Sequence, residues 1–191
     1  MDLNRTLKGI EGRYNGVQTL ELQFSESYAF KGRKRTESGT LYLHKPGRMR
    51  WQYTNPPGKL FVADGKFFYY YSPEDHRAEK LNAKEADDLR GPLAFLLGRL
   101  NFADDFREYR TSPEGVDARI TALPKSDKAP FTEVTFLASP DFTIKQLQVR
   151  GQDGSLMEYD FQGEKKNPAV PDAMFKFYLP PGAEWVDSSR N

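Results

Sequence analysis

The sequence predicts a mainly β fold with a few helices, in the form of an antiparallel barrel or a strongly curved antiparallel sheet. The first observation behind this prediction is that apolar and polar residues alternate with a period of two over many short segments. The second is that turn-forming residues separate these segments at a spacing of roughly ten residues. The 191-residue length, without an internal repeat or a long linker, predicts one domain over residues 1–191.

The chain is expected to begin with a helix. Its first apolar residues recur every three or four positions, as on one helix face. They are Leu3, Leu7, Ile10, Tyr14 and Val17. Asn15-Gly16 is a plausible helix stop. Two interpretations remain open: a helix that only packs in the core, and a helix that also lines a ligand cavity.

Strands are expected to follow this helix without interruption up to residue 81. The period changes to two at Gln18, and the basic segment 31–35 is expected to turn the chain. The Asp64-Gly65 dipeptide between two apolar runs is a strong hairpin signal. The strands expected in this part cover residues 18–30, 39–44, 49–53, 59–63, 66–71 and 77–81.

A short apolar helix is expected over residues 91–100, with Pro92 at its first position. Because it is apolar around most of its circumference, it must be covered on nearly all sides or must itself cover something. Turn signals then separate six further strands. These are expected over residues 106–110, 117–123, 133–137, 143–149, 156–161 and 174–178.

Composition excludes several classes of function. The net charge of +1 leaves no basic field for nucleic acid. The absence of cysteine excludes disulfides, a thiol nucleophile and thiolate-bound zinc. His44 and His76 lack metal-ligand spacing, and no nucleophile elbow, phosphate loop or dinucleotide fingerprint occurs. We therefore expect no enzyme activity, no cofactor and no metal.

The sequence contains no apolar run of 18 residues that could span a membrane as a helix. The first residues also lack the basic start and apolar run of a signal peptide. Either the protein stays in the cytoplasm or a leader has been removed from this chain, and composition does not choose between the two.

Aromatic residues are unusually abundant, with 14 Phe, 10 Tyr and 2 Trp. The run over residues 67–71 places rings on both faces of one strand. One face can belong to an ordinary core, and the other needs a second apolar neighbour. A helix set inside a curved sheet or a ligand cavity would each supply that neighbour.

An ordered series of motifs over residues 3 to 186 resembles the outer-membrane lipoprotein carrier (LolA) family. Its main segment, residues 39–53, has a Gly-x-Leu strand and then a basic residue, Pro46 and Trp51 in the family's order. An apolar, Asp-Gly, aromatic hairpin follows at residues 61–71. Further matches are Pro92-Leu93, Asp153-Gly154 and the pattern Phe175-x-Phe177-x-x-Pro180-x-Gly182.

This resemblance implies an incomplete, strongly curved antiparallel barrel, with the N-terminal and central helices as a lid over an apolar cavity. It implies a monomeric periplasmic carrier that holds the acyl chains of lipoproteins and shuttles them from the inner to the outer membrane. An inner-membrane ABC complex would release the cargo, and an outer-membrane acceptor would receive it. The usual leader of the family is a cleaved signal peptide, which fits the start at Met1-Asp2.

The resemblance also implies the binding residues. The lid is expected to contain Leu93, Phe95, Leu96 and Leu97. The lining is expected to contain Leu22, Phe24, Met49, Trp51, Phe68 and Tyr70. A strand register shifted by one residue would replace Phe68 and Tyr70 by Phe67, Tyr69 and Tyr71. Phe95→Glu is expected to abolish acyl binding with the fold largely intact.

The chain departs from the family pattern at two positions, one in a basic rim formed by Lys45, Arg48 and Arg50, and one in the lining. Where the family has an arginine that helps to hold the lid closed, this chain has Lys45, which cannot make a planar bidentate contact. Met49 stands where many members have an aromatic residue. Either the closed state is weaker here, or Arg48 or Arg50 takes over the role.

Other functions stay open beside the carrier. The same fold would suit a lipid-anchored acceptor, an envelope sensor, or a carrier of other amphiphiles such as glycolipids. An acceptor would show an anchoring cysteine, and a sensor would need a second domain. An enzyme acting on a hydrophobic substrate is disfavoured by the missing catalytic residues.

Overall fold

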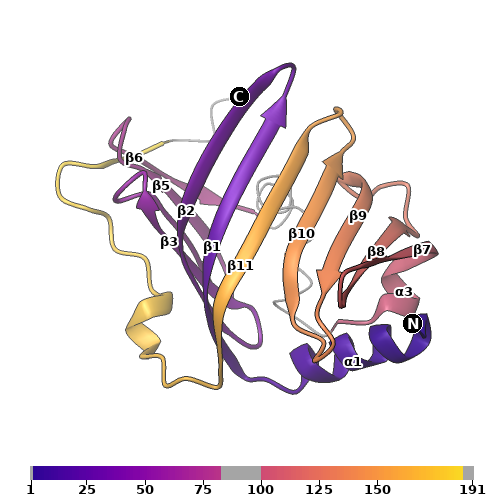
Figure 1. Ribbon diagram of the computed structural model, residues 1–191. Helices are drawn as coiled ribbons and strands as arrows, with labels where there is room; N and C mark the ends of the chain where they lie inside the picture. The colour runs from indigo at the N-terminus through magenta and orange to yellow at the C-terminus, as the bar shows by residue number, and fades with distance from the viewer. Residues whose placement is uncertain (1, 83–99, 187–191) are drawn as a thin grey trace. The chain divides into compact units, whose positions relative to one another are not determined.

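The computed structural model of the chain describes residues 2–82 and 100–186 (Figure 1). The central helix expected over residues 91–100 therefore lies, apart from its last residue, outside the described residues, as do all four expected lid residues. The described helices are α1 (Leu3–Asn15), α3 (Phe102–Asp105) and the 3-10 helix η2 (Asp172–Phe175).

The strands confirm a mainly β fold. In chain order they are β1 (Thr19–Phe30), β2 (Arg33–His44), β3 (Arg48–Asn55), β4 (Leu60–Asp64), β5 (Phe68–Ser72), β6 (Arg77–Leu81), β7 (Phe106–Glu114), β8 (Asp117–Pro124), β9 (Phe131–Ala138), β10 (Ile144–Gly151), β11 (Leu156–Lys166) and β12 (Glu184–Trp185). They form one sheet in the order β12-β6-β5-β4-β3-β2-β1-β11-β10-β9-β8-β7, which leaves β12 and β7 at its two ends.

The sheet departs from the expected antiparallel pattern at one end. Trp185 of β12 pairs with Ala78 of β6 in parallel, whereas the other neighbouring pairs whose register the structure gives are antiparallel. A parallel pair needs a long connection rather than a tight turn. The connection from β6 to β12 is long enough, because the strands of the second half of the chain are formed within it.

The chain groups into two compact units, each made of separate stretches of sequence. Unit 1 comprises Met1–Val17, Phe24–Thr36 and Arg99–Gln162. Unit 2 comprises Gln18–Gln23, Glu37–Gly98 and Gly163–Asn191. Strands β1, β2 and β11 each contribute residues to both units. The single domain expected over residues 1–191 stays a prediction.

In unit 1, α1 lies across one end of β9 and β10 (Figure 1). Its N-terminus is capped by Asp2, whose carboxylate accepts a hydrogen bond from the backbone N–H of Arg5. Leu7, Ile10 and Tyr14 are buried on one side of the helix, as the periodicity predicts. The Tyr14 hydroxyl accepts a 2.8 Å hydrogen bond from the backbone N–H of Ile144 at the start of β10.

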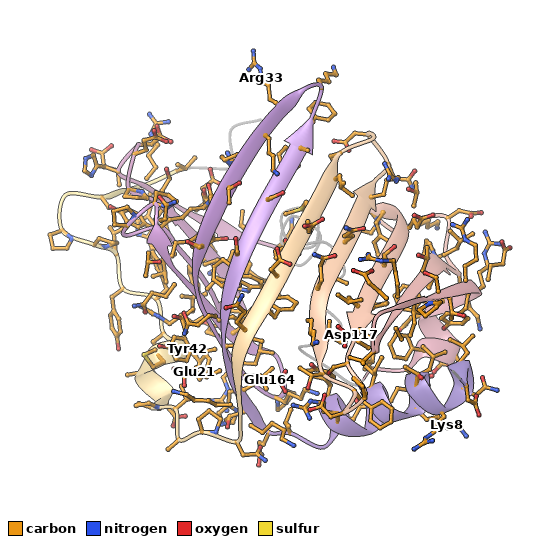
Figure 2. The ribbon with its side chains drawn as sticks, in the orientation of Figure 1. Lys8, Glu21, Arg33, Tyr42, Asp117 and Glu164 are labelled. Carbon is orange, nitrogen blue, oxygen red and sulfur yellow. The ribbon has the colours of Figure 1, made fainter. Side chains whose placement is uncertain are left out.

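The expected basic turn is shorter than predicted, because β2 begins at Arg33 rather than near Gly39. Lys31 and Gly32 have positive φ angles of 48° and 75°. Such a pair forms the tight two-residue hairpin that matches the twist of its strands. Arg33 stands at the tip of this hairpin, where the side chains are exposed (Figure 2).

In unit 2, the prediction of a strand over residues 174–178 is wrong, because η2 ends at Phe175 and irregular chain follows it. Phe175 and Phe177 of this segment pack separately on other elements, whereas Tyr178 is exposed. The Phe175 ring contacts His44 edge-on, with 5.8 Å between ring centroids. The Phe177 ring stacks on Tyr69, with centroids 5.1 Å apart.

Candidate functional site

One face of the unit 2 strands carries most of the large apolar side chains, and we call it the aromatic face. The pairing aligns Trp51 with Leu41 on β2 and with Phe61 on β4, so these side chains share a face. The aromatic face comprises Leu41, Leu43, Met49, Trp51, Tyr53, Phe61, Phe68 and Tyr70. Met49 is 2% exposed, Trp51 0% and Phe61 1%, so the centre of this face is buried.

The register of β5 shows which of its rings share a face with Trp51, while their role in lining a cavity stays a prediction. Tyr70 lies opposite Phe61, and Phe68 lies opposite Ala63, which in turn faces Met49. Phe68 and Tyr70 therefore point to the same side as Trp51, and both are half-buried. Contacts within the face include a 3.0 Å hydrogen bond from the Trp51 indole N–H to Met49 Sδ and the Phe61 and Phe68 rings, whose centroids lie 6.2 Å apart.

Leu22 and Phe24, expected as lining, are both buried on β1. Gln23 shares a 3.0 Å hydrogen bond with Thr40, a residue on the side of β2 opposite to the aromatic face. Leu22, which alternates with Gln23, therefore points to the aromatic side of unit 2. Phe24 alternates with Gln23 in the same way, but it belongs to unit 1.

A buried ion pair lies at one end of the aromatic face, and the sequence analysis missed it. Lys59 Nζ and Glu37 Oε2 are 2.5 Å apart, with the two residues 8% and 6% exposed. The ring centroids of Tyr53 and Tyr70 lie 4.8 and 5.6 Å from the same Nζ. Residue type offered no signal, because a lysine after Pro56-Pro57-Gly58 resembles an exposed turn residue.

The two arginines expected at the basic rim lie on the opposite face from Met49 and Trp51, since they alternate with them along β3. Arg48 forms a 3.2 Å ion pair with Asp172 and stacks over the Phe175 ring. Arg50 donates a 3.2 Å hydrogen bond to the carbonyl of Met174, and burial lowers its pKa. Both therefore fasten the C-terminal segment to β3, a contact that the sequence did not suggest.

Lys45 differs from these arginines. It follows the last residue of β2, and its backbone N–H donates a 2.9 Å hydrogen bond to the carbonyl of Gln18. Burial lowers the pKa of its ammonium. Because the expected lid residues lie outside the described part of the chain, the proposed rim role of Lys45 stays a prediction.

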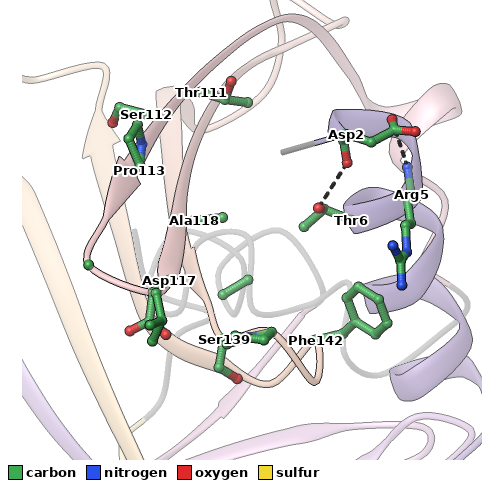
Figure 3. Close-up of a pocket in the computed structure, with 14 residues that line it drawn as sticks. Asp2, Arg5, Thr6, Thr111, Ser112, Pro113, Asp117, Ala118, Ser139 and Phe142 are labelled. Atoms are coloured by element: carbon green, nitrogen blue, oxygen red, sulfur yellow. Dashed lines mark hydrogen bonds between the residues drawn. The ribbon is translucent and has the colours of Figure 1, made fainter.

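Unit 1 contains a cavity of about 500 Å³ beside the N-terminus of α1 (Figure 3). Its floor includes the buried Ala118 and Ala138, which pair across β8 and β9. Phe142 contributes an apolar wall near α1, and Asp2 and Arg5 contribute a charged one (Figure 3). None of the lining residues predicted from the sequence is among the described residues that border this cavity.

The aromatic face and the cavity offer mainly apolar and hydrogen-bonding contacts to a ligand. Over residues 2–82 and 100–186, no group of three or more His, Cys, Asp or Glu side chains is placed to hold a metal ion. The aromatic face presents rings and alkyl groups, whose stabilisation of a ligand grows with the apolar area removed from water. The aromatic face also contains the buried Lys59 ammonium and the buried Glu37 carboxylate.

A family model described as outer membrane lipoprotein carrier protein LolA matches residues 15–178. The chain belongs to the LolA family. Its relatives include an outer-membrane lipoprotein carrier protein of Chromobacterium violaceum, 27% identical, with 90% of this chain and 82% of the relative covered. One of the same description from Yersinia enterocolitica is 26% identical, with 95% and 87% covered.

Solved structures share the LolA-type fold at low identity. An uncharacterised conserved protein from Thermus thermophilus gives a TM-score of 0.57 at 11% identity, covering 97% of this chain and 99% of its own. A DUF1329 family protein from Desulfovibrio piger gives 0.54 at 12% identity, covering 91% and 97%. In the described part of this LolA-family chain, no helix has the length and apolarity that crossing a membrane requires.

Proposed function

We propose that this protein carries acylated lipoproteins, and that the acyl chains lie on the aromatic face of unit 2. The observation that carries this proposal is the set of side chains brought onto one face by the register of β2 to β5, with Met49, Trp51 and Phe61 at its centre. Such a face offers contacts to a flexible apolar chain along its whole length. The relatives named as lipoprotein carriers support the same role.

Energetics favour a carrier that releases its cargo without chemistry. Each acyl methylene withdrawn from water contributes about 0.8 kcal/mol, so ten methylenes contribute roughly 8 kcal/mol. Part of that free energy is offset, because Trp51 and Phe61 are already buried before cargo arrives. Binding replaces one set of contacts by another, and the protein must open to admit the chains.

The route of the cargo is part of the proposal. The carrier acts as a monomer in the periplasm, takes lipoproteins from an inner-membrane ABC complex, and delivers them to an outer-membrane acceptor. It performs no catalysis, requires no cofactor or metal, and binds no nucleic acid. Family membership and the names of the relatives support the lipoprotein carrier role from which this route follows.

Cargo capture tests the proposal directly. The protein is expressed with a secretion leader in a Gram-negative host, purified from the periplasm without detergent, and examined by native mass spectrometry. Copurification of acylated polypeptides is expected. Free lipid without any polypeptide would instead assign the protein to the traffic of other amphiphiles, and absence of any acylated ligand would overturn the proposal.

Neighbouring phenylalanines provide a matched pair of variants. Phe68 lies on the aromatic face, whereas Phe67 is 44% exposed, with Lys80 Nζ 3.5 Å from its ring centroid. Phe68→Glu is expected to abolish capture, because it places a charge among apolar side chains. Phe67→Glu is expected to retain capture. Equal capture by the two variants would show that the aromatic face does not hold the acyl chains.

A further inference from the structure

We propose that the Lys59–Glu37 ion pair is a binding site for the polar linkage of the cargo: Lys59 donates hydrogen bonds to the carbonyl oxygens of the ester groups that join acyl chains to glycerol. The inference rests on the proposed function, because it concerns the polar end of the same face. The group recognised beside the acyl chains is their ester linkage. Recognition of this linkage makes the carrier selective for acyl esters over other apolar molecules.

The position of Lys59 places it at the boundary between apolar and charged side chains. The backbone N–H of Tyr53 donates a 3.1 Å hydrogen bond to the Lys59 carbonyl, which sets Lys59 opposite Tyr53 across the β3–β4 ladder. The adjoining row is Trp51 and Phe61, and the row after it is Met49 and Ala63. The face is thus apolar at one end and carries the strong hydrogen-bonding groups of Lys59 and Glu37 at the other, and an acylated glycerol likewise joins apolar chains to a polar, uncharged ester end.

The path of the lysine side chain explains how the pair reaches across the sheet. Glu37 belongs to β2, whereas Lys59 directly precedes β4, so the side chains meet over the intervening β3. Gly39, the β2 partner of Tyr53, lets the β3 backbone approach β2 closely on this row. A Cβ at Gly39 would lie 2.1 Å from the Gln52 carbonyl oxygen, so no larger residue can occupy this position without moving β3.

The chemistry of the pair suits an ester group. A lysine ammonium has three donors and no acceptor, and the contact with Glu37 uses one donor. Tyr53 and Tyr70 present their rings to Nζ, which are weaker partners than a carbonyl oxygen in a dry site. An ester carbonyl is an uncharged acceptor, so it can join the ammonium without adding a second buried charge.

Stability alone gives little reason for this pair. Replacing a buried ion pair by apolar residues of similar volume is often neutral or stabilising, because two charges must lose their hydration. A face built only to bury aromatic rings would be served equally well by a methionine and a glutamine at these positions. The charged pair gains a purpose if it contributes to recognition.

Two ligands that differ only in their linkage test the inference. Binding of 1,2-dioleoylglycerol and of its dialkyl ether analogue is measured by displacement of a fluorescent lipid. The ether has the same chains and lacks the carbonyl oxygens. Wild-type protein is expected to bind the ester about tenfold more tightly, the equivalent of roughly 1.4 kcal/mol.

Variants then assign the preference to the pair. In the double variant Lys59→Met with Glu37→Gln, which leaves no unpaired buried charge, the two ligands are expected to bind equally. The control is Lys145→Met, which removes the ammonium of an ion pair with Asp117 in unit 1 and is expected to retain the ester preference.

The outcomes separate the two proposals. If wild-type protein binds both ligands equally, or if the double variant keeps the ester preference, the ion pair does not recognise the linkage, while acyl binding itself stands. If wild-type protein binds neither ligand, both the carrier function and the inference drawn from it fail.

Discussion

Replacing Trp51 by alanine probes the aromatic face at its centre. Trp51 is fully buried between Leu41 and Phe61 in the strand ladder, and its indole N–H donates to Met49 Sδ. Truncating a buried tryptophan removes its apolar contacts and leaves a cavity, which costs roughly 3–5 kcal/mol of unfolding free energy. For a chain of this size each 1 kcal/mol lowers the melting temperature by about 2–4 °C. A loss of about 6–20 °C is therefore expected.

The second tryptophan supplies the control for this experiment. Trp185 is 50% exposed and contacts Tyr69 and Phe177 at its edge, so Trp185→Ala is expected to cost about 1 kcal/mol. The measurement is thermal and urea unfolding of both variants, followed by circular dichroism. A loss for Trp51→Ala no larger than that for Trp185→Ala would refute the assignment of Trp51 to a packed interior.

Three further predictions concern single positions. Tyr14→Phe leaves the buried backbone N–H of Ile144 without its hydroxyl acceptor, and is expected to cost about 1–3 kcal/mol in urea unfolding, with faster hydrogen exchange at Ile144. Gly39→Ala forces a Cβ against the β3 backbone, and is expected to lower the melting temperature, whereas the same change at the open, helical position Gly12 is expected to raise it. The pKa of Asp141 is lowered to about 2, below the ordinary value near 3.9, and the largest cause is the hydrogen bond from Ser139. The ionised Asp141 carboxylate therefore stabilises the folded protein fully above about pH 4, and this stabilisation is lost as the pH falls through about 2. Asp141→Asn is expected to flatten the stability profile in that window, and an unchanged slope would contradict the role of the carboxylate.

Periodicity located most of the fold because the elements concerned are apolar on one side only. Helix α1 and the strands from β3 to β6 begin and end close to where the apolar alternation predicts. The first residues of β2 were not predicted as strand, because residues 33–36 are exposed on both faces and show no alternation of apolar and polar residues. Pro171 and Pro180 flank the wrongly predicted strand, whose rings pack separately on other elements.

The sequence predicted which apolar side chains of β3 share one face, although their role in binding stays a prediction. The alternation of Met49 and Trp51 with arginines predicts which side chains share a face, and the structure agrees. Sequence could not reveal that Lys59 and Glu37 meet, because their approach depends on three strands being aligned. Nor could it show that Arg48 reaches Asp172, 124 positions further along the chain.

The division of the chain into interleaved units has a consequence for biosynthesis. Unit 2 begins at Gln18 and is completed only by the segment that starts at Gly163, whereas the rest of unit 1, Phe24–Thr36 and Arg99–Gln162, is made in between. A ribosome must therefore release nearly the whole polypeptide before unit 2 can close. Truncating the gene at either end removes part of a unit rather than a unit, and long-range pairing of this kind is intrinsically slow. The nascent chain would need protection from aggregation until its last strands arrive.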